Sequence, residues 1–262
     1  MMLCTNNNSL PAIPALERGL DVLERVSVTD TSRTLTALAR SCGRSVSELQ
    51  RVVACLHQRG YLCRDSSGAY RISSKLFRLG HACPPFQDLL TRARGPMREF
   101  ALRTGESVHI SILAEDQLLI LANVPGPGYM QLGVNVGSVH NPIRSASGKV
   151  LLSAMTSVDL QAFIKRNAVK PRDVQALRPR LAGIRRRGYE YVESHLFRGV
   201  YDLALGVTIP GGESIAAVAC SWLRPRNHAG KGSDKAWSLL LPKLRHCARE
   251  IAAALEPTTA DA

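Results

Sequence analysis

Residues 47–58 carry side chains of the kind that read nucleic acid. Aliphatic residues recur there at helical spacing, so one stripe of a helix can be buried while the opposite face stays polar. An arginine on the polar face can bind guanine with two hydrogen bonds, a glutamine can pair with adenine, and alanine or serine lets the backbone approach the major groove. The apolar stripe holds Leu49, Val52, Val53 and Leu56, and the polar face holds Ser47, Gln50, Arg51, Ala54 and Gln58.

Cations on either side of this helix could hold the phosphate backbone of DNA. Arg44 comes just before the helix, and Arg64 and Arg71 lie in two short β-prone runs after it. Every surface helix has a polar outer face, so the helix alone does not separate a DNA reader from an ordinary solvated helix. The order of the neighbouring elements favours the DNA reader.

Three expected helices and a hairpin position these side chains. Residues 15–26 and 36–41 have helical spacing, and residues 47–59 form a third helix, which we expect Ser47 to cap. Residues 61–64 and 69–72 flank a glycine-containing turn and are expected to pair. In the first helix, Leu16, Leu20 and Leu23 are expected to be buried. This order is the outline of a winged helix-turn-helix domain.

Residues 144–149 have the chemistry to bind a small carboxylate. A helix is expected to open there, and the free N–H groups of its first turn can receive an anion. Arg144 could add a bidentate pair with a carboxylate. The alternative is that Arg144 faces solvent and Lys149 pairs on the surface. The expected binding residues are Arg144, Ser145, Ala146, Ser147 and Gly148.

The composition limits the classes of protein. The chain has 262 residues, more than one typical domain of about 100–200 residues. Hydrophobic residues make up 45%, too many for a disordered chain, and no apolar run approaches the ~18 residues of a membrane span. The polar N-terminus does not resemble a secretory signal.

Seven scattered cysteines without a C-x-x-C pair favour reduced thiols over disulfides or a zinc site, and no cofactor or metal is expected.

The net charge is strongly positive. The chain has 34 lysines and arginines against 21 acids, which gives +13, and a basic chain without a membrane segment most often meets nucleic acid. Residues 1–75 hold ten of these cations and six acids, a net charge of only +4. Residues 165–198 hold ten cations and three acids, and a solvated face explains them better than a second DNA site.

The pattern changes in the second part of the chain. A helix through a kink at Gly95-Pro96 is expected to follow a break at Cys83-Pro84-Pro85. Strands and helices then mix without regular βαβ alternation, which predicts an α+β domain. The strands are expected at residues 108–113, 118–124, 203–209 and 214–220, and the helices at 148–155, 159–166, 178–187 and 233–255.

Short motifs recur in a fixed order along the chain. PALERGLDVL at residues 14–23, LTALARSCG at 35–43 and the helix at 47–56, which contains Arg51, precede GYL at 60–62 and GAYRI at 68–72. TGESVH at residues 104–109, Gly137, SASGKVLL at 145–152, RGY at 187–189 and GV at 199–200 follow. Over about 240 residues this order resembles the IclR-type bacterial transcription regulators.

The resemblance implies a winged helix-turn-helix DNA-binding domain at residues 14–75, a helical linker at 76–93 and a GAF-like α+β domain for effector binding and oligomerisation at 94–256, with tails at 1–13 and 257–262. It implies a cytoplasmic homo-oligomer, a dimer or tetramer and not an enzyme, that binds a double-stranded DNA operator and responds to a small organic acid. The pocket loop is most similar to members that sense aromatic acids. The expected DNA contacts are Arg44, Ser47, Gln50, Arg51, Ala54, Arg64 and Arg71.

Of two residues at pocket positions of the family, one departs from the usual residue type and the other does not. Asp202 stands where relatives often have Cys or Ser, whereas Ser221 keeps a hydroxyl. A carboxylate at position 202 would repel an anionic effector unless it were paired or protonated. We therefore expect either an Arg144–Asp202 pair that fills the pocket or an effector with both acidic and donor groups.

Two other functions stay open. Glu48 replaces a residue that is usually Thr or Ser at the DNA-facing start of the helix, which would suit a ligand-sensing scaffold without specific DNA binding; the same acid could instead stabilise the helix N-terminus. Ser145 and Lys149 are four residues apart and could imitate the nucleophile pair of a Ser/Lys-type hydrolase, although no orienting group is evident. The dispersed histidines contain no H-E-x-x-H motif.

Overall fold

The computed structural model describes residues 13–28, 31–81, 84–129, 131–209, 214–223 and 236–256. One compact unit ends at Gln87 and the other begins at Asp88, a division that falls inside the predicted linker at 76–93. The expected tails lie outside the described residues, apart from Ile13. Among the described helices, none is both long enough and apolar enough to cross a membrane.

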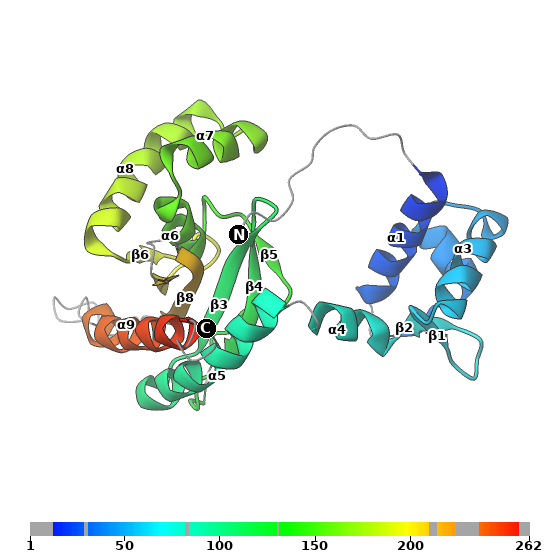
Figure 1. Cartoon of the computed structure of the whole chain (residues 1–262), viewed down its shortest axis with the longest axis horizontal. Helices are drawn as coiled ribbons and strands as arrows, with labels where there is room; N and C mark the ends of the chain where they lie inside the picture. The colour runs from blue at the N-terminus through cyan, green and yellow to red at the C-terminus, as the bar shows by residue number, and fades with distance from the viewer. Residues whose placement is uncertain are drawn as a thin grey trace, which may run out of the picture. The chain divides into compact units, whose positions relative to one another are not determined.

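The N-terminal unit consists of helices that carry a two-stranded wing (Figure 1). The backbone of Arg33 pairs with Tyr70 and anchors the wing to the chain before the second helix. The core is shared by the three leading helices and the wing, and it includes Val22, Val26, Leu38, Leu49, Val53 and Leu62. This order confirms the predicted winged helix-turn-helix. The elements are α1 (Pro14–Ser27), α2 (Leu35–Ser41), α3 (Val46–Gln58), β1 (Leu62–Arg64), β2 (Tyr70–Ile72) and α4 (Ser74–His81).

The buried face of α1 differs from the prediction. Leu16 and Leu20 remain 57% and 50% exposed, whereas Val22 and Val26 are buried. Gly19 belongs to the buried stripe, and a Cβ added there would lie 3.8 Å from a methyl carbon of α3. The helix therefore packs through the stripe of Gly19, Val22 and Val26 and not through the stripe of Leu16 and Leu20.

The second unit is built around a six-stranded sheet in the order β5-β4-β3-β8-β7-β6, in which every neighbouring pair is antiparallel. The strands are β3 (Val108–Ala114), β4 (Gln117–Val124), β5 (Val139–His140), β6 (Glu190–Glu193), β7 (Val200–Thr208) and β8 (Ser214–Leu223). The helices are α5 (Pro84–Thr104), α6 (Ala146–Ala154), α7 (Ser157–Arg166), α8 (Pro171–Arg187) and α9 (Ala236–Leu255). The α+β class expected of a GAF-like domain is confirmed.

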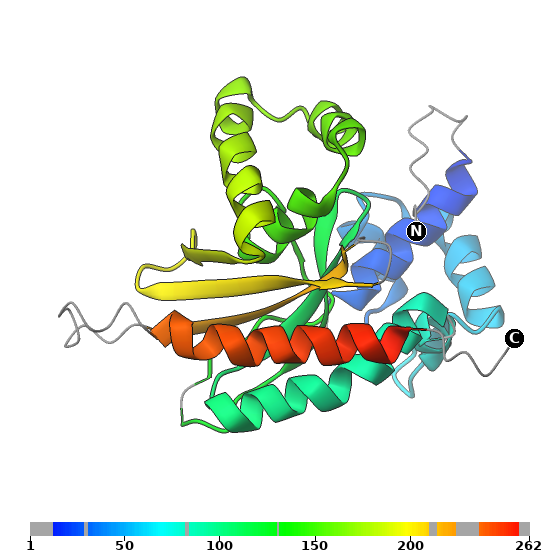
Figure 2. The same ribbon diagram turned by 60° about the vertical axis from the view of Figure 1, so that its left-hand side comes forward.

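Helices cover both faces of this sheet (Figure 2). α6 packs on β7 and β8 and is contacted by α8, whereas α9 packs on β7 from the other face and runs beside α5. Ala204, Ala217 and Ala219 belong to the core under α6. Their small side chains let α6 lie close to the strands, so that residues at the start of α6 approach residues of the sheet.

Several boundaries differ from the prediction. α8 begins at Pro171 and not at Arg178, whereas α5 continues through Pro96 as predicted. The strands β5 and β6 were not predicted, because β5 has only two residues and β6 follows directly on the left-handed Gly188 (φ +79°) that ends α8. Cys83 and the predicted start of the last helix at residue 233 lie outside the described residues.

Candidate DNA-reading surface and effector pocket

Helix α3 starts with reciprocal hydrogen bonds between Ser45 and Glu48. The Ser45 hydroxyl accepts from the backbone N–H of Glu48 at 3.3 Å, and the Glu48 carboxylate accepts from the backbone N–H of Ser45 at 2.9 Å. Ser45, and not the predicted Ser47, is therefore the N-cap residue. The hydrogen bonds from Ser45 lower the pKa of Glu48, and the positive charges of Arg18 and Arg44 add to the effect. Glu48 thus stabilises the start of the helix, as one of the two interpretations of its role predicted.

The predicted reading face of α3 is open to solvent. Leu49 and Val53 on the opposite face are buried in the core of the unit. Within the described residues, the side chains of Gln50 and Arg51 form no hydrogen bond or ion pair, so their donors and acceptors are available to base edges. The exposed residues of this face are Arg44, Ser47, Gln50, Arg51 and Ala54.

The two arginines of the wing lie on opposite faces of it. Arg64 is the register partner of Tyr70, whereas Arg71 is the partner of Cys63 one position along, and successive side chains of a strand point to opposite faces. The Arg64 Nε donates to the carbonyl of Gly68 at 2.9 Å, so this side chain also braces the tip of the wing. Both arginines are exposed, but they cannot contact phosphates from the same face.

Helix α6 presents two free backbone N–H groups at its start. Ser145 is the N-cap residue: its hydroxyl accepts from the N–H of Gly148 at 3.2 Å, and its own N–H donates to the carbonyl of Asn141. Within the described residues, the N–H groups of Ala146 and Ser147 form no hydrogen bond, although each residue is only 3% exposed. Buried N–H groups without a partner are rare. The four predicted anion donors are thereby reduced to these two.

Asp202 and Ser221 face α6 from the sheet. They are partners on β7 and β8, and the Ser221 hydroxyl donates to Oδ1 of Asp202 at 2.6 Å. Desolvation raises the pKa of Asp202, although this hydrogen bond and the charges of His195 and Lys149 oppose the shift. Desolvation also lowers the pKa of the half-buried Lys149, which the carboxylates of Glu190 and, less strongly, Asp202 oppose. Residues distant in the sequence thus form one electrostatically coupled group.

Two histidines that the sequence did not single out belong to this group. The ring Nε2 of His109 on β3 lies 3.5 Å from the Ser147 hydroxyl at the start of α6. Desolvation, together with repulsion from His140, lowers the pKa of His109 to about 4. Desolvation and nearby cations, Lys149 first among them, lower the pKa of His195. His109 lies on β3 and His195 in the loop between β6 and β7, so the tertiary fold brings them together and no spacing in the sequence could reveal them.

Arg144 does not join this pocket. Its side chain is exposed, and among the described residues it forms no ion pair with Asp202. Its carbonyl instead accepts from Nζ of Lys149 at 3.1 Å. The expected Arg144–Asp202 pair is therefore wrong, because Asp202 is hydrogen-bonded to Ser221 while the arginine turns outward. The other expectation, an effector with both acidic and donor groups, remains.

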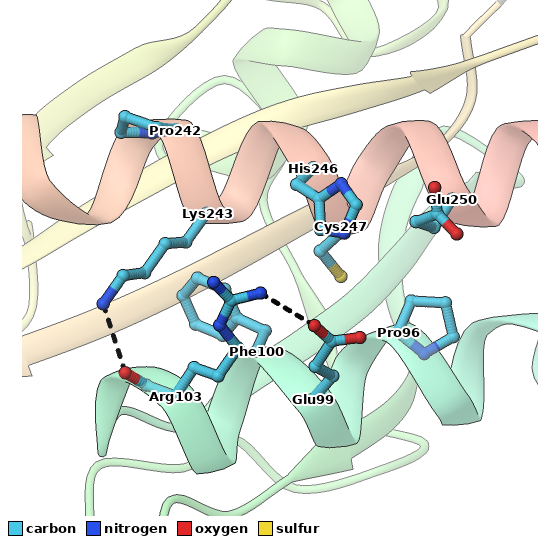
Figure 3. Close-up of a pocket in the computed structure, with 9 residues that line it drawn as sticks. All are labelled: Pro96, Glu99, Phe100, Arg103, Pro242, Lys243, His246, Cys247 and Glu250. Carbon is cyan, nitrogen blue, oxygen red and sulfur yellow. Dashed lines mark hydrogen bonds and ion pairs between the residues drawn. The ribbon is translucent and has the colours of Figure 1, made fainter.

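A groove between α5 and α9 contains none of these residues (Figure 3). Its side chains contact one another: Arg103 donates to Glu99 at 2.9 Å, and Nζ of Lys243 donates to the carbonyl of Arg103 at 3.1 Å. Desolvation raises the pKa of the Cys247 thiol to about 12, so the thiol stays protonated. The long cations of this groove are already engaged, so they do not offer an effector a free positive charge.

Two family models match the chain. Residues 15–66 match the IclR helix-turn-helix domain, and residues 85–253 match the C-terminal domain of the bacterial transcriptional regulator IclR. This chain belongs to the IclR family of bacterial transcriptional regulators. It is a DNA-binding regulator whose C-terminal domain binds an effector.

Relatives within the IclR family are similar along most of the chain. The regulator XynR of Escherichia coli is 27% identical over 83% of this chain and 89% of its own length, and BhcR of Paracoccus denitrificans is 27% identical over 94% and 88%. An IclR homologue from Microbacterium hydrocarbonoxydans, solved with 4-hydroxybenzoate, has a TM-score of 0.76 at 23% identity and covers 92% of this chain and 98% of its own. These relatives are regulators.

The hydrolase alternative loses its chemical basis. The Ser145 hydroxyl caps α6, and the Lys149 ammonium donates to a backbone carbonyl, so the two side chains do not form a nucleophile pair. Family membership likewise disfavours a scaffold without DNA binding.

Proposed function

We propose that this IclR-family regulator reads a double-stranded DNA operator with α3 and responds to a small organic acid that carries a hydrogen-bond donor, such as a hydroxylated aromatic acid. The observation that carries the effector chemistry is that the free, buried N–H groups of Ala146 and Ser147 begin a helix that packs on the strands that carry Asp202 and Ser221. An effector that has a carboxylate but no hydrogen-bond donor would find no favourable contact with the carboxylate of Asp202.

Each end of such an acid has a partner in the pocket. Its carboxylate would accept hydrogen bonds from the free N–H groups of Ala146 and Ser147 and pair with Lys149. Its hydroxyl would donate to Asp202, which has one oxygen engaged by Ser221. The 4-hydroxybenzoate complex of a structural neighbour supports this class of ligand.

The effector acts on DNA binding through the assembly. We propose a cytoplasmic homo-oligomer, a dimer or tetramer, whose two α3 helices enter major grooves about 34–36 Å apart or a multiple of this distance. Arg51 and Gln50 would read bases, while Arg44, Arg64 and Arg71 would hold phosphates. The effector regulates only if it binds one arrangement of the ligand domains more tightly than the other.

Calorimetric titration with matched acids tests the effector chemistry. Each hydroxy acid, such as 4-hydroxybenzoate, is compared with its deoxy counterpart, such as benzoate. The hydroxyl should tighten binding by about tenfold or more, which is the usual strength of a hydrogen bond to a charged group. Asp202→Ala should remove this preference, whereas Asp202→Asn keeps the shape and one acceptor oxygen and should retain part of it. If Asp202→Ala discriminates as well as the wild type, the proposed role of Asp202 is wrong.

A further inference from the structure

We infer that the ligand domain has a second anion-binding site, separate from the effector pocket, that takes a small metabolite with two negative charges. The site is a hollow of about 390 Å³ between the β3–β4 turn, the loop that leads into α6, and the start of α8. It includes Arg144 and Lys170 but neither Asp202 nor Ser221.

The balance of charges in this hollow favours an anion. Its two carboxylates already have partners: Asp116 accepts from Arg166 through both oxygens at 2.7 Å, and Asp173 lies 3.8 Å from Arg172. The paired guanidinium of Arg166 lowers the pKa of Asp116, so this carboxylate stays ionised and committed to its partner. These pairs leave the remaining cations of the hollow without a counter-charge.

Arg144 and Lys170 are those remaining cations. Within the described part of the chain, neither side chain forms an ion pair or hydrogen bond, and both are exposed. An arginine binds a carboxylate or phosphate group with two parallel hydrogen bonds, and a lysine adds a point charge. Two cations in one hollow suit a ligand with two negative charges, either a dicarboxylate or a phosphate monoester.

The walls of the hollow are held in place by the backbone. The N–H of Arg144 donates to the carbonyl of Asn141, and Lys170 is fixed as the N-cap residue of α8. Arg144 also directly precedes Ser145, the N-cap residue of α6, and its carbonyl accepts from Lys149. A ligand held by Arg144 would therefore contact the same loop that borders the effector pocket, so the two sites share a structural element.

Titration of the full-length protein with succinate and with inorganic phosphate tests this inference. We expect saturable single-site binding of at least one probe at low ionic strength. Lys170→Gln and Arg144→Gln should each weaken it about tenfold or more, as the loss of one charge-assisted hydrogen bond does. Lys165→Gln is the matched control, because this exposed lysine at the end of α7 loses the same charge but does not line the hollow. Succinate binding alone assigns the site to dicarboxylates, and phosphate binding alone assigns it to phosphate monoesters.

Three results would overturn the inference. The first is that neither probe binds saturably to the wild type. The second is that Lys165→Gln weakens binding as much as Lys170→Gln, which shows a diffuse charge effect. The third is that Asp202→Ala abolishes binding, which places the probe in the effector pocket. The first two results leave the proposed effector chemistry untouched, so failure of the second site is distinguishable from failure of the effector pocket.

Discussion

Replacing Gly148 with alanine tests whether the close approach of α6 to the preceding loop builds the effector pocket. The added Cβ would lie 2.3 Å from Cα and 2.4 Å from the carbonyl oxygen of Pro142, and 2.6 Å from Oγ of Ser145. Ordinary contact begins at 3.4 Å, so the start of α6 must move by 3.4 − 2.3 = 1.1 Å or the loop must yield. Overpacking of this kind costs about 1–3 kcal/mol of the free energy of unfolding.

The same movement should weaken effector binding. Ligand groups must be held within about 0.5 Å of their productive positions, and the displaced N–H groups of Ala146 and Ser147 would exceed that tolerance. Urea denaturation measures the stability, and calorimetric titration with an active hydroxy acid measures the affinity.

Gly95→Ala is the matched control for Gly148→Ala. Gly95 lies in α5 with nothing within 4 Å of an added Cβ, so alanine there should raise the free energy of unfolding by about 0.5–1 kcal/mol. The reasoning is refuted if Gly148→Ala is as stable as the wild type and binds the acid equally well.

Three further substitutions test the contacts that support the DNA-reading helix α3 and the sheet of the ligand domain. Ser45→Ala should lower the free energy of unfolding of the N-terminal unit by about 0.5–2 kcal/mol, measured by circular dichroism in urea, because α3 loses its N-cap. Arg180→Ala should lower the thermal midpoint, at a cost of about 1–3 kcal/mol, since the fully buried Glu190 loses one of its two ion pairs among the described residues and keeps the other, with Arg187. In the unfolded chain His109 takes up a proton below its usual pKa of 6.5, but in the folded protein it does so only near pH 4. The free energy of unfolding should therefore fall by about 2–3 kcal/mol as the pH drops from 6.5 to 4, and His109→Gln should flatten this profile in urea titrations.

The reading face of α3 could be predicted from sequence because helical spacing alone decides which side is buried. Leu49 and Val53 fill the core as predicted, and Gln50 and Arg51 remain exposed. Helical spacing did not identify the buried side of α1, because two apolar stripes compete there and the periodicity does not decide between them.

The effector pocket could be predicted only in part. The start of α6 was recognisable from its small residues, but the pairing of Asp202 with Ser221 depends on the register of two strands, which no local pattern specifies. His109, on β3, and His195, in the loop between β6 and β7, likewise depend on the tertiary fold. The sequence predicted Arg144 in the effector pocket because it is next to the anion donors of α6. Its side chain is exposed instead and lines the second hollow, which Lys170 also lines.

Footprinting of genomic fragments selected by the purified protein tests the central claim most directly. The protein should protect a defined operator, binding should weaken steeply as salt rises, and the hydroxy acid should change the protection. Arg51→Ala should lose about 1–3 kcal/mol at one base step, whereas Arg59→Ala, an exposed arginine at the C-cap of α3, should protect the same site. A protein that prefers no genomic fragment over random duplex, at any ionic strength and with any acid present, would contradict the account.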